Sequence, residues 1–159
     1  MFDPAEQQVQ RDRSDAPSGV GKVVVNVDGG SRGNPGPAGA GIAVSADDGT
    51  VLLERGIFIG HATNNVAEYR GLIGGLESAA LLGAREVEIV SDSELLVRQM
   101  NGQYRVKNAG LKPLYDKACQ LARQFARCQF RHVRREQNVL ADKLANLAMD
   151  RRREVHSAE

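Results

Sequence analysis

Blocks of apolar residues separated by turn-forming residues predict three strands at the start of the ordered chain. A β-branched run at 22–30 (KVVVNVDGG) indicates a buried strand. The glycines and prolines of 31–38 are typical of a turn. Alternating and apolar stretches at 39–46 and 50–60 then predict two more strands, joined by a hairpin turn at 47–49 (DDG).

Helical and strand patterns alternate through the rest of the chain. A helix with one apolar face is predicted to begin at a cap formed by Thr63 or Asn64 and to end near Leu82. The remaining elements are a strand at 86–91, a short helix at 93–101, a loop at 102–108, a helix at 109–126, a strand at 128–133 and a last helix at 138–153.

This order of elements predicts an α/β fold built on a mixed five-stranded sheet flanked by helices. The first three strands should be antiparallel. Right-handed crossovers through helices make the last two parallel to the first. The carboxyl ends of strands one, three, four and five then share one edge, where open α/β sheets bind ligands.

Only the middle of the chain has this regular pattern. Residues 1–21 are polar and without periodicity, which predicts a disordered N-terminal tail. One domain is expected over 22–153, followed by a C-terminal tail at 154–159. The chain has no run of 18 apolar residues and its first residues lack a secretory core, so we expect a cytoplasmic protein that does not enter a membrane.

Four acidic residues fall at the predicted ligand edge. They comprise Asp28 at the end of the first strand, Glu68 early in the first helix, Asp92 after the fourth strand and Asp142 early in the last helix. Each has an ordinary explanation alone, as a turn residue, a helix-dipole partner or a cap. Together, uncompensated carboxylates would repel one another unless they hold hard cations such as Mg²⁺ or Mn²⁺. Two such ions, about 3.5–4 Å apart, are the usual device for phosphodiester hydrolysis.

Charge is distributed unevenly along the chain. Residues 1–97 contain 7 Lys and Arg against 14 Asp and Glu, whereas residues 98–159 contain 14 against 6. A basic half beside a carboxylate-rich half suggests contact with nucleic acid, although solvated basic helices would give the same totals.

Other kinds of site fit the sequence poorly. The two cysteines, Cys119 and Cys128, form no metal-binding pair and are expected to fill the core. The scattered histidines do not suggest zinc. The chain has no Trp and few aromatic residues, which disfavours a base-stacking single-strand binder. No glycine pattern matches a P-loop or a dinucleotide fingerprint.

Four motifs in order resemble the ribonuclease H type 1 family across residues 22–149. They are VDGGSRGNPG at 27–36, TNNVAE at 63–68, SDS at 91–93 and REQNVLAD at 135–142. The resemblance implies an endonuclease that cuts the RNA strand of RNA–DNA hybrids with two Mg²⁺ ions (Mn²⁺ possible) and leaves 5′-phosphate and 3′-hydroxyl ends. It assigns the metals to the same four acids that the topology selects: Asp28, Glu68, Asp92 and Asp142.

The resemblance also implies which residues contact the substrate. Backbone groups at Gly29, Gly30 and Ser31 and the Asn34 side chain would lie at the RNA ribose, whose 2′-hydroxyl separates RNA from DNA. Contacts to the nucleic-acid backbone would come from Thr63, at a DNA phosphate, and from Asn64 and Asn65. The glycines would in any case form a tight turn, and the two asparagines are also ordinary helix caps.

Two departures from the better-known bacterial form place the chain in a compact branch. The basic helix and loop that serve there as a substrate handle are missing, since only 102–108 joins the two middle helices. The segment before Asp142 is too short for the family's mobile histidine loop. It places Arg135 seven residues before Asp142, and we expect Arg135 to assist catalysis. His132 should share a sheet face with Phe130 and be held by packing.

Two other functions remain open at this point. A resolvase or integrase core would use the same carboxylates on DNA, and a non-catalytic module would bind hybrid without cutting it. In each case we expect a monomer with no obligatory protein partner.

Overall fold

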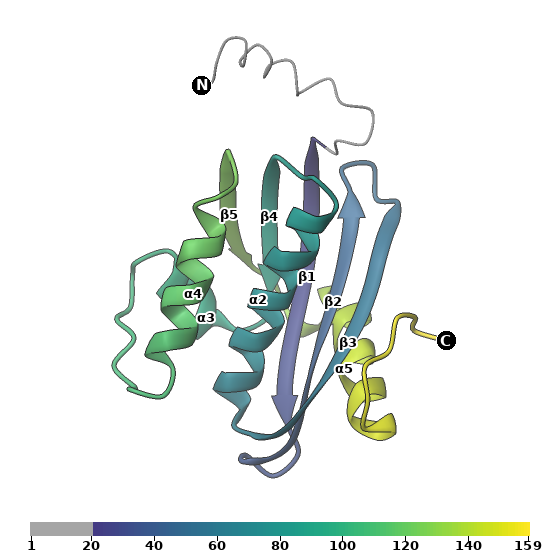
Figure 1. The fold of residues 1–159 in the computed structure, drawn as a ribbon, viewed down its shortest axis with the longest axis vertical. Helices are drawn as coiled ribbons and strands as arrows, with labels where there is room; N and C mark the ends of the chain where they lie inside the picture. Colours follow the sequence, from purple (N-terminus) through teal and green to yellow (C-terminus); the bar gives the residue numbers. More distant parts are fainter. Residues whose placement is uncertain (1–20) are drawn as a thin grey trace.

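A five-stranded mixed sheet forms the centre of the molecule (Figure 1). The computed structural model describes residues 21–159. The strands lie in the order β3-β2-β1-β4-β5. Along the chain the elements are β1 (Lys22–Ser31), β2 (Gly36–Ala46), β3 (Val51–Ala62), α2 (Asn64–Leu81), β4 (Glu86–Ser91), α3 (Glu94–Met100), α4 (Lys112–Ala122), β5 (Arg127–His132), the short 3-10 turn Arg135–Gln137 and α5 (Val139–Arg151).

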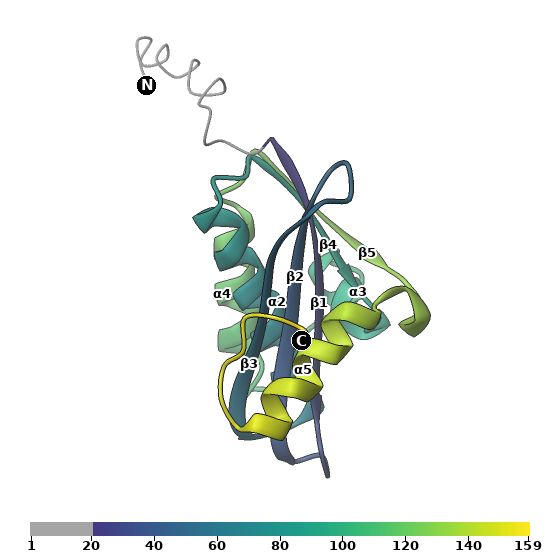
Figure 2. The same ribbon diagram turned by 90° about the vertical axis from the view of Figure 1, so that its right-hand side faces the viewer.

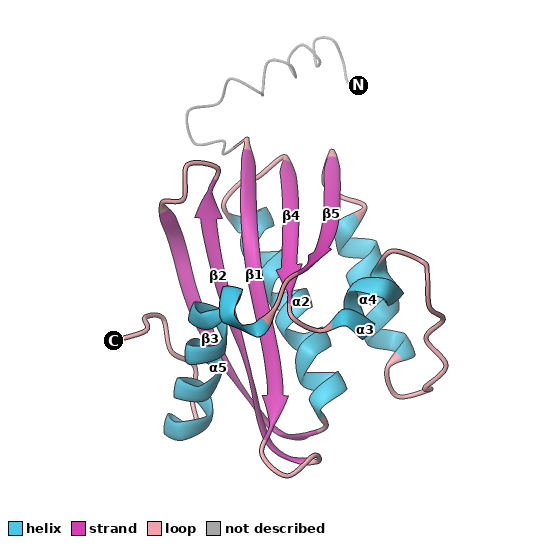
Figure 3. Cartoon of the chain, turned by 180° about the vertical axis from the view of Figure 1, so that it is seen from behind, coloured by secondary structure: helices cyan, strands magenta, loops and turns pink. Residues whose placement is uncertain are grey.

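Strand directions agree with the prediction from the connections. β1 pairs antiparallel with β2, and β2 pairs antiparallel with β3. β4 runs parallel to β1, and β5 runs parallel to β4 (Figure 3). The predicted fold class, with three antiparallel strands followed by parallel ones, is therefore confirmed.

Helices cover both faces of the sheet. α2 and α4 lie on one face and α5 lies on the other (Figure 2). Along β1, Val23, Val25 and Val27 are buried, as expected where every second side chain faces the same layer. They pack with α2 residues such as Leu72 and Leu76 in the main core. A smaller cluster joins α5 to the other face.

Several element boundaries differ from the predicted ones, most clearly in β2, α4 and α5. β2 begins at Gly36, inside the predicted turn, because Gly36 and Pro37 pair with the end of β3. α4 is shorter than predicted at both ends. Before it, the Asn108 side chain accepts hydrogen bonds from the Gly110 and Leu111 amides and holds a separate turn. α5 ends at Arg151.

The segment predicted as a C-terminal tail packs on β3. Val155 is only 4% exposed and pairs with Gly56 in an isolated antiparallel bridge. Glu154 forms an ion pair with Arg55, and the Ala158 amide donates to Glu54 Oε1 at 2.8 Å. The predicted N-terminal tail lies outside the described residues, apart from Gly21. Within residues 21–159, no helix is both long enough and apolar enough to cross a bilayer.

Candidate active site

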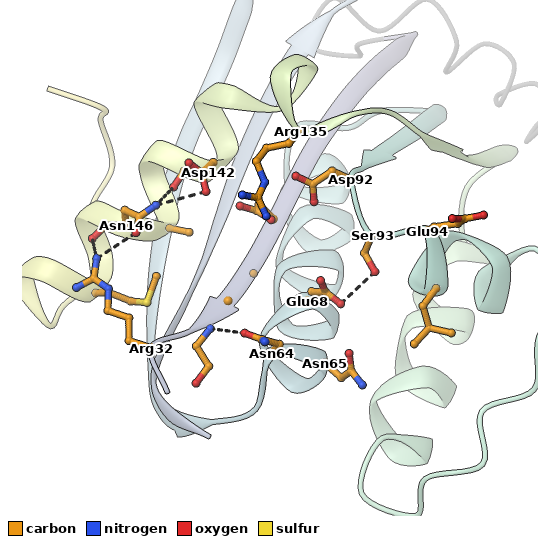
Figure 4. Close-up of a pocket in the computed structure, with 17 residues that line it drawn as sticks. Arg32, Asn64, Asn65, Glu68, Asp92, Ser93, Glu94, Arg135, Asp142 and Asn146 are labelled. Carbon is orange, nitrogen blue, oxygen red and sulfur yellow. Dashed lines mark hydrogen bonds between the residues drawn. The ribbon is translucent and has the colours of Figure 1, made fainter. Parts of the chain in front are cut away.

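The four predicted carboxylates meet at one cavity of about 570 Å³ (Figure 4). Asp28 comes from β1, Glu68 from α2, Asp92 from the residue after β4 and Asp142 from α5. These residues are distant in the sequence, and the sheet connections bring them to the same edge. The topology argument therefore placed all four acids correctly.

Two glycines allow the helices to come close enough to the sheet for this convergence. A Cβ atom on Gly29 would overlap the backbone of Ala67, the residue before Glu68. A Cβ atom on Gly41 would overlap the backbone of Ala141, the residue before Asp142. Because glycine has no side chain, α2 and α5 approach the strands closely at the points where they carry their acids.

Burial and mutual repulsion shift the ionisation of two of these acids. Burial, followed by the charges of Asp92 and Asp142, raises the pKa of Asp28 to about 8. Burial also raises the pKa of Glu68 to about 7, with a further contribution from Asp92, although a hydrogen bond from Ser93 opposes the shift. Near neutral pH, Asp28 therefore keeps its proton and Glu68 is partly protonated, and a bound cation would displace these protons.

The acids line the cavity as an open arrangement. Within residues 21–159, no three His, Cys, Asp or Glu side chains form a closed metal-ligand set. Because the raised pKa keeps a proton on Asp28, the four acids are not all charged at neutral pH without a cation. Their donor atoms are all oxygens, which fits a hard divalent cation such as Mg²⁺ or Mn²⁺ better than zinc.

Asn138 anchors the start of α5, a role that the sequence did not reveal. Its side chain is 1% exposed, donates to the Val27 carbonyl at 2.8 Å and accepts from Asn26 Nδ2 at 2.9 Å. It makes no side-chain capping bond to α5, although asparagine at a helix start is typical of a cap. It instead ties the turn carrying Asp142 to the strand carrying Asp28.

Ser93 has a second role that the sequence did not reveal. Its hydroxyl accepts from the Leu96 amide at 3.2 Å, which is the ordinary cap of α3. The same hydroxyl donates to Glu68 Oε1 at 3.1 Å (Figure 4). Ser93 therefore orients the Glu68 carboxylate from the residue next to Asp92.

The predicted substrate-binding residues divide between two cavities. The acidic cavity is lined by Gly29, Gly30, Ser31, Asn64 and Asn65. A neighbouring cavity of about 530 Å³ is lined by Asn34 and Thr63, and it shares Asn64 and Asn65.

Hydrogen bonds hold several of these residues together. Asn64 Oδ1 accepts from the Ser31 amide at 2.7 Å, and the Asn64 amide donates to Asn34 Oδ1 at 3.0 Å. The Thr63 hydroxyl caps α2 by accepting from the Val66 amide at 3.2 Å. The glycine-rich loop and the start of α2 therefore form one connected surface.

Arg135 and His132 lie in different surroundings. Arg135, in the turn after β5, lines the acidic cavity (Figure 4). His132 is exposed at the end of β5 and does not line that cavity. The prediction that His132 is held by packing was wrong: β5 is an edge strand, and even Phe130 is only half-buried there.

Sequence comparison finds relatives across most of the chain. Residues 26–148 match a family described as reverse transcriptase-like. A bifunctional protein of Mycobacterium tuberculosis is 56% identical over 130 residues, which cover 81% of this chain but only 36% of that protein. A ribonuclease HI of Halobacterium salinarum is 41% identical over 134 residues, covering 84% of this chain and 67% of that protein. The chain thus spans about a third of the length of its mycobacterial relatives.

Solved structures agree with these relationships. The N-terminal RNase H domain of the M. tuberculosis protein, solved as a fusion with maltose-binding protein, superposes with a TM-score of 0.80 at 55% identity, covering 82% of this chain and 94% of that one. LC11-RNase H1 in complex with an RNA/DNA hybrid gives a TM-score of 0.78 at 42% identity, covering 82% and 98%. With its four acids at one sheet edge and these matches in both sequence and structure, the chain belongs to the ribonuclease H type 1 family.

Proposed function

We propose that this protein hydrolyses the RNA strand of RNA–DNA hybrids with divalent metal ions. The observation that carries the proposal is the convergence of Asp28, Glu68, Asp92 and Asp142 on one open cavity beside a glycine-rich loop. A relative at 42% identity was solved in complex with an RNA/DNA hybrid, which supports the same substrate here.

The four acids would hold Mg²⁺, or Mn²⁺ in its place. Two bound ions would supply a hydroxide nucleophile at neutral pH and stabilise the leaving oxygen, so that cleavage leaves a 5′-phosphate and a 3′-hydroxyl. Ser93 orients Glu68 for this role, and Asn138 fixes the approach of α5 to β1. The Arg135 guanidinium lines the same cavity, where its permanent charge would stabilise a phosphate that gains negative charge.

RNA would be distinguished from DNA at the glycine-rich loop. A Cβ atom on Gly30 would have only the Asn64 side chain within 4 Å, so this stretch of backbone is open to a close ligand. Backbone groups at this position can hydrogen-bond to a ribose 2′-hydroxyl, which DNA lacks. The Asn34 and Thr63 side chains line the neighbouring cavity, where they would contact the nucleic-acid backbone.

A cleavage assay on end-labelled substrates tests the proposal. Wild-type protein should cut hybrid, but neither duplex RNA nor duplex DNA, in Mg²⁺ or Mn²⁺, and EDTA should stop the reaction. Asp92→Asn should lower turnover at least a hundredfold while leaving the circular dichroism spectrum unchanged, because Asp92 lies beside both Asp28 and Glu68. Ligation of the products identifies the 5′-phosphate.

Each alternative function has its own outcome in this assay. Cleavage of duplex DNA would favour a resolvase-like enzyme. Hybrid binding without cleavage in any metal would favour a non-catalytic module. Asp92→Asn turnover within tenfold of wild type would remove the proposed metal site.

A further inference from the structure

Arg32 and Asn146 connect the glycine-rich loop to Asp142 along one wall of the acidic cavity (Figure 4). Arg32 Nη2 donates to Asn146 Oδ1 at 3.0 Å, and Arg32 Nη1 lies 2.8 Å from Asp150 Oδ1. Asn146 Nδ2 donates to the Asp142 carbonyl at 3.0 Å and approaches Asp142 Oδ1 at 3.4 Å. A continuous series of hydrogen bonds thus runs from the loop to one of the four acids.

The guanidinium group determines which atom of the Asn146 amide accepts a hydrogen bond and which one donates. A guanidinium has donors only, so the Asn146 atom that faces Arg32 must be the amide oxygen. The amide nitrogen is then turned towards Asp142, where it donates. Without Arg32, the Asn146 amide oxygen loses this donor, and the orientation of the side chain then depends only on the bonds from its nitrogen to Asp142.

We infer that Arg32 is a positioning residue for metal binding, acting through Asn146 to hold the Asp142 carboxylate in its place at the cavity. The inference rests on the proposed function because it takes Asp142 to be a cation ligand. Groups that orient metal ligands by hydrogen bonding change metal affinity by about 10- to 100-fold. Arg32 itself is exposed and Asn146 is half-buried, so substitutions at Arg32 should leave the fold intact.

Electrostatics alone predicts the opposite sign. Arg32 is a cation beside a cation site, so removing its charge would strengthen metal binding if charge were its only contribution. The positioning role predicts weaker binding. The two explanations are therefore separated by the direction of the change.

The test measures Mn²⁺ binding, by electron paramagnetic resonance and without nucleic acid, to wild type, Arg32→Ala, Asn146→Ala and the double variant. Each single variant should bind Mn²⁺ at least about tenfold more weakly. The double variant should be no weaker than Asn146→Ala, since Arg32 acts through Asn146. Arg32→Lys keeps the charge but not the paired donors, and should recover part of the affinity.

Lys143→Gln provides the matched control. Lys143 is exposed on α5 next to Asp142 and lies outside the hydrogen-bonded series. Its loss should leave Mn²⁺ affinity unchanged or slightly stronger. Melting curves confirm that each variant is folded, and Arg32→Ala alone carries the test if Asn146→Ala does not fold.

Steady-state kinetics separates positioning from substrate contact. A positioning role predicts low turnover of hybrid at low Mg²⁺ that recovers at high Mg²⁺, with KM within about threefold of wild type. Wild-type Mn²⁺ affinity in Arg32→Ala, or a raised KM at every Mg²⁺ concentration, would overturn the inference. Failure of the wild type to cut hybrid would instead overturn the proposed function, and weaker Mn²⁺ binding by the variants would still support the positioning role.

Discussion

Asp28 and Glu68 make the metal-free cavity sensitive to pH. In the unfolded chain Asp28 loses its proton near its ordinary pKa of 3.8, whereas in the folded protein it keeps the proton up to about pH 8. Between these values the folded state binds more protons than the unfolded state. The free energy of unfolding therefore falls as pH rises from about 4 to about 8. Glu68 adds to the trend up to about pH 7.

Replacing Asp28 by asparagine should remove most of this dependence. In EDTA at pH 8–9, Asp28→Asn should melt at least about 3 °C above wild type, because the buried carboxylate no longer ionises among Asp92 and Asp142. At pH 4–5 the two proteins should be nearly equal. Asp47→Asn, at an exposed position in the turn after β2, is the control and should show no such trend. An Asp28→Asn midpoint at or below that of wild type at pH 8–9 would contradict the raised pKa.

Arg135 and His132 can be separated by kinetics. Arg135→Ala should lower turnover on hybrid at least tenfold at saturating substrate, because the guanidinium lines the cavity that holds the acids. His132→Ala should change turnover less than threefold, since the imidazole is exposed away from that cavity. Normal turnover with a raised KM in Arg135→Ala would show that Arg135 only binds phosphate. The reverse ranking of the two variants would assign the role to His132.

The sequence was sufficient to find the acids but not the residues that orient them. The four acids lie near the ends of strands or in the first turns of helices, and chain topology decides where such positions meet. Ser93 and Asn138 also stand at helix starts, where local hydrogen bonding to the helix is the usual interpretation. Ser93 bonds to Glu68, and Asn138 bonds to β1. Both bonds depend on the distances between elements, which the local sequence pattern does not encode.

At the scale of elements, the distance between α5 and the sheet decides where Asp142 lies. Gly41→Val should destabilise the fold by about 1–3 kcal/mol, because its side chain would overlap the Ala141 backbone. The added side chain should also push α5, and with it Asp142, away from the sheet. Hybrid cleavage should therefore fall by more than the loss of folded protein explains. Activity per folded molecule, with folding measured by circular dichroism, tests this.

Gly21, just before β1, provides a control glycine with open space around it. An added Cβ would have no atom within 4 Å there, so Gly21→Ala should leave both stability and activity unchanged. Gly41→Val with normal activity per folded molecule would show that Asp142 does not depend on this close approach.

Element type was predictable from periodicity, and element ends were not. The valines of β1 and the apolar face of α2 gave the correct strand and helix. The start of α4 depends on the Asn108 turn, and the start of β2 depends on the pairing of Gly36 with Ala62 of β3. Both are settled by hydrogen bonds that the hydrophobic pattern does not report.

At the scale of the whole molecule, the uneven charge predicts salt-dependent binding. Residues 98–159 carry most of the Lys and Arg, and Arg105, Lys107 and Lys112 line a groove of about 830 Å³. Affinity for uncleaved hybrid, measured in Ca²⁺, should fall at least tenfold between 50 and 200 mM salt, because bound phosphates release counterions. A flat response would contradict the proposed substrate.

Charge substitutions test whether this groove contributes to the salt dependence of hybrid binding. The double variant Arg105→Gln/Lys107→Gln should reduce the slope of affinity against salt. Lys22→Gln is the control. It removes a charge at the start of β1, the end of that strand away from Asp28, and should leave the slope unchanged. Equal slopes in all three proteins would exclude the groove from the contact.

The bridge between Val155 and Gly56 also bears on how the molecule behaves at high concentration. β3 is an edge strand, and edge strands are templates for pairing between molecules. Gly56 donates to the Val155 carbonyl at 2.7 Å and accepts from its amide at 2.9 Å, so this part of the edge is already occupied. Val155→Asp should release it and increase light scattering in concentrated samples, whereas Val51→Asp, at an exposed position on the same strand, should not. We therefore expect the residues after α5 to limit self-association by covering part of the β3 edge. This role concerns the solubility of the protein and not its catalytic chemistry.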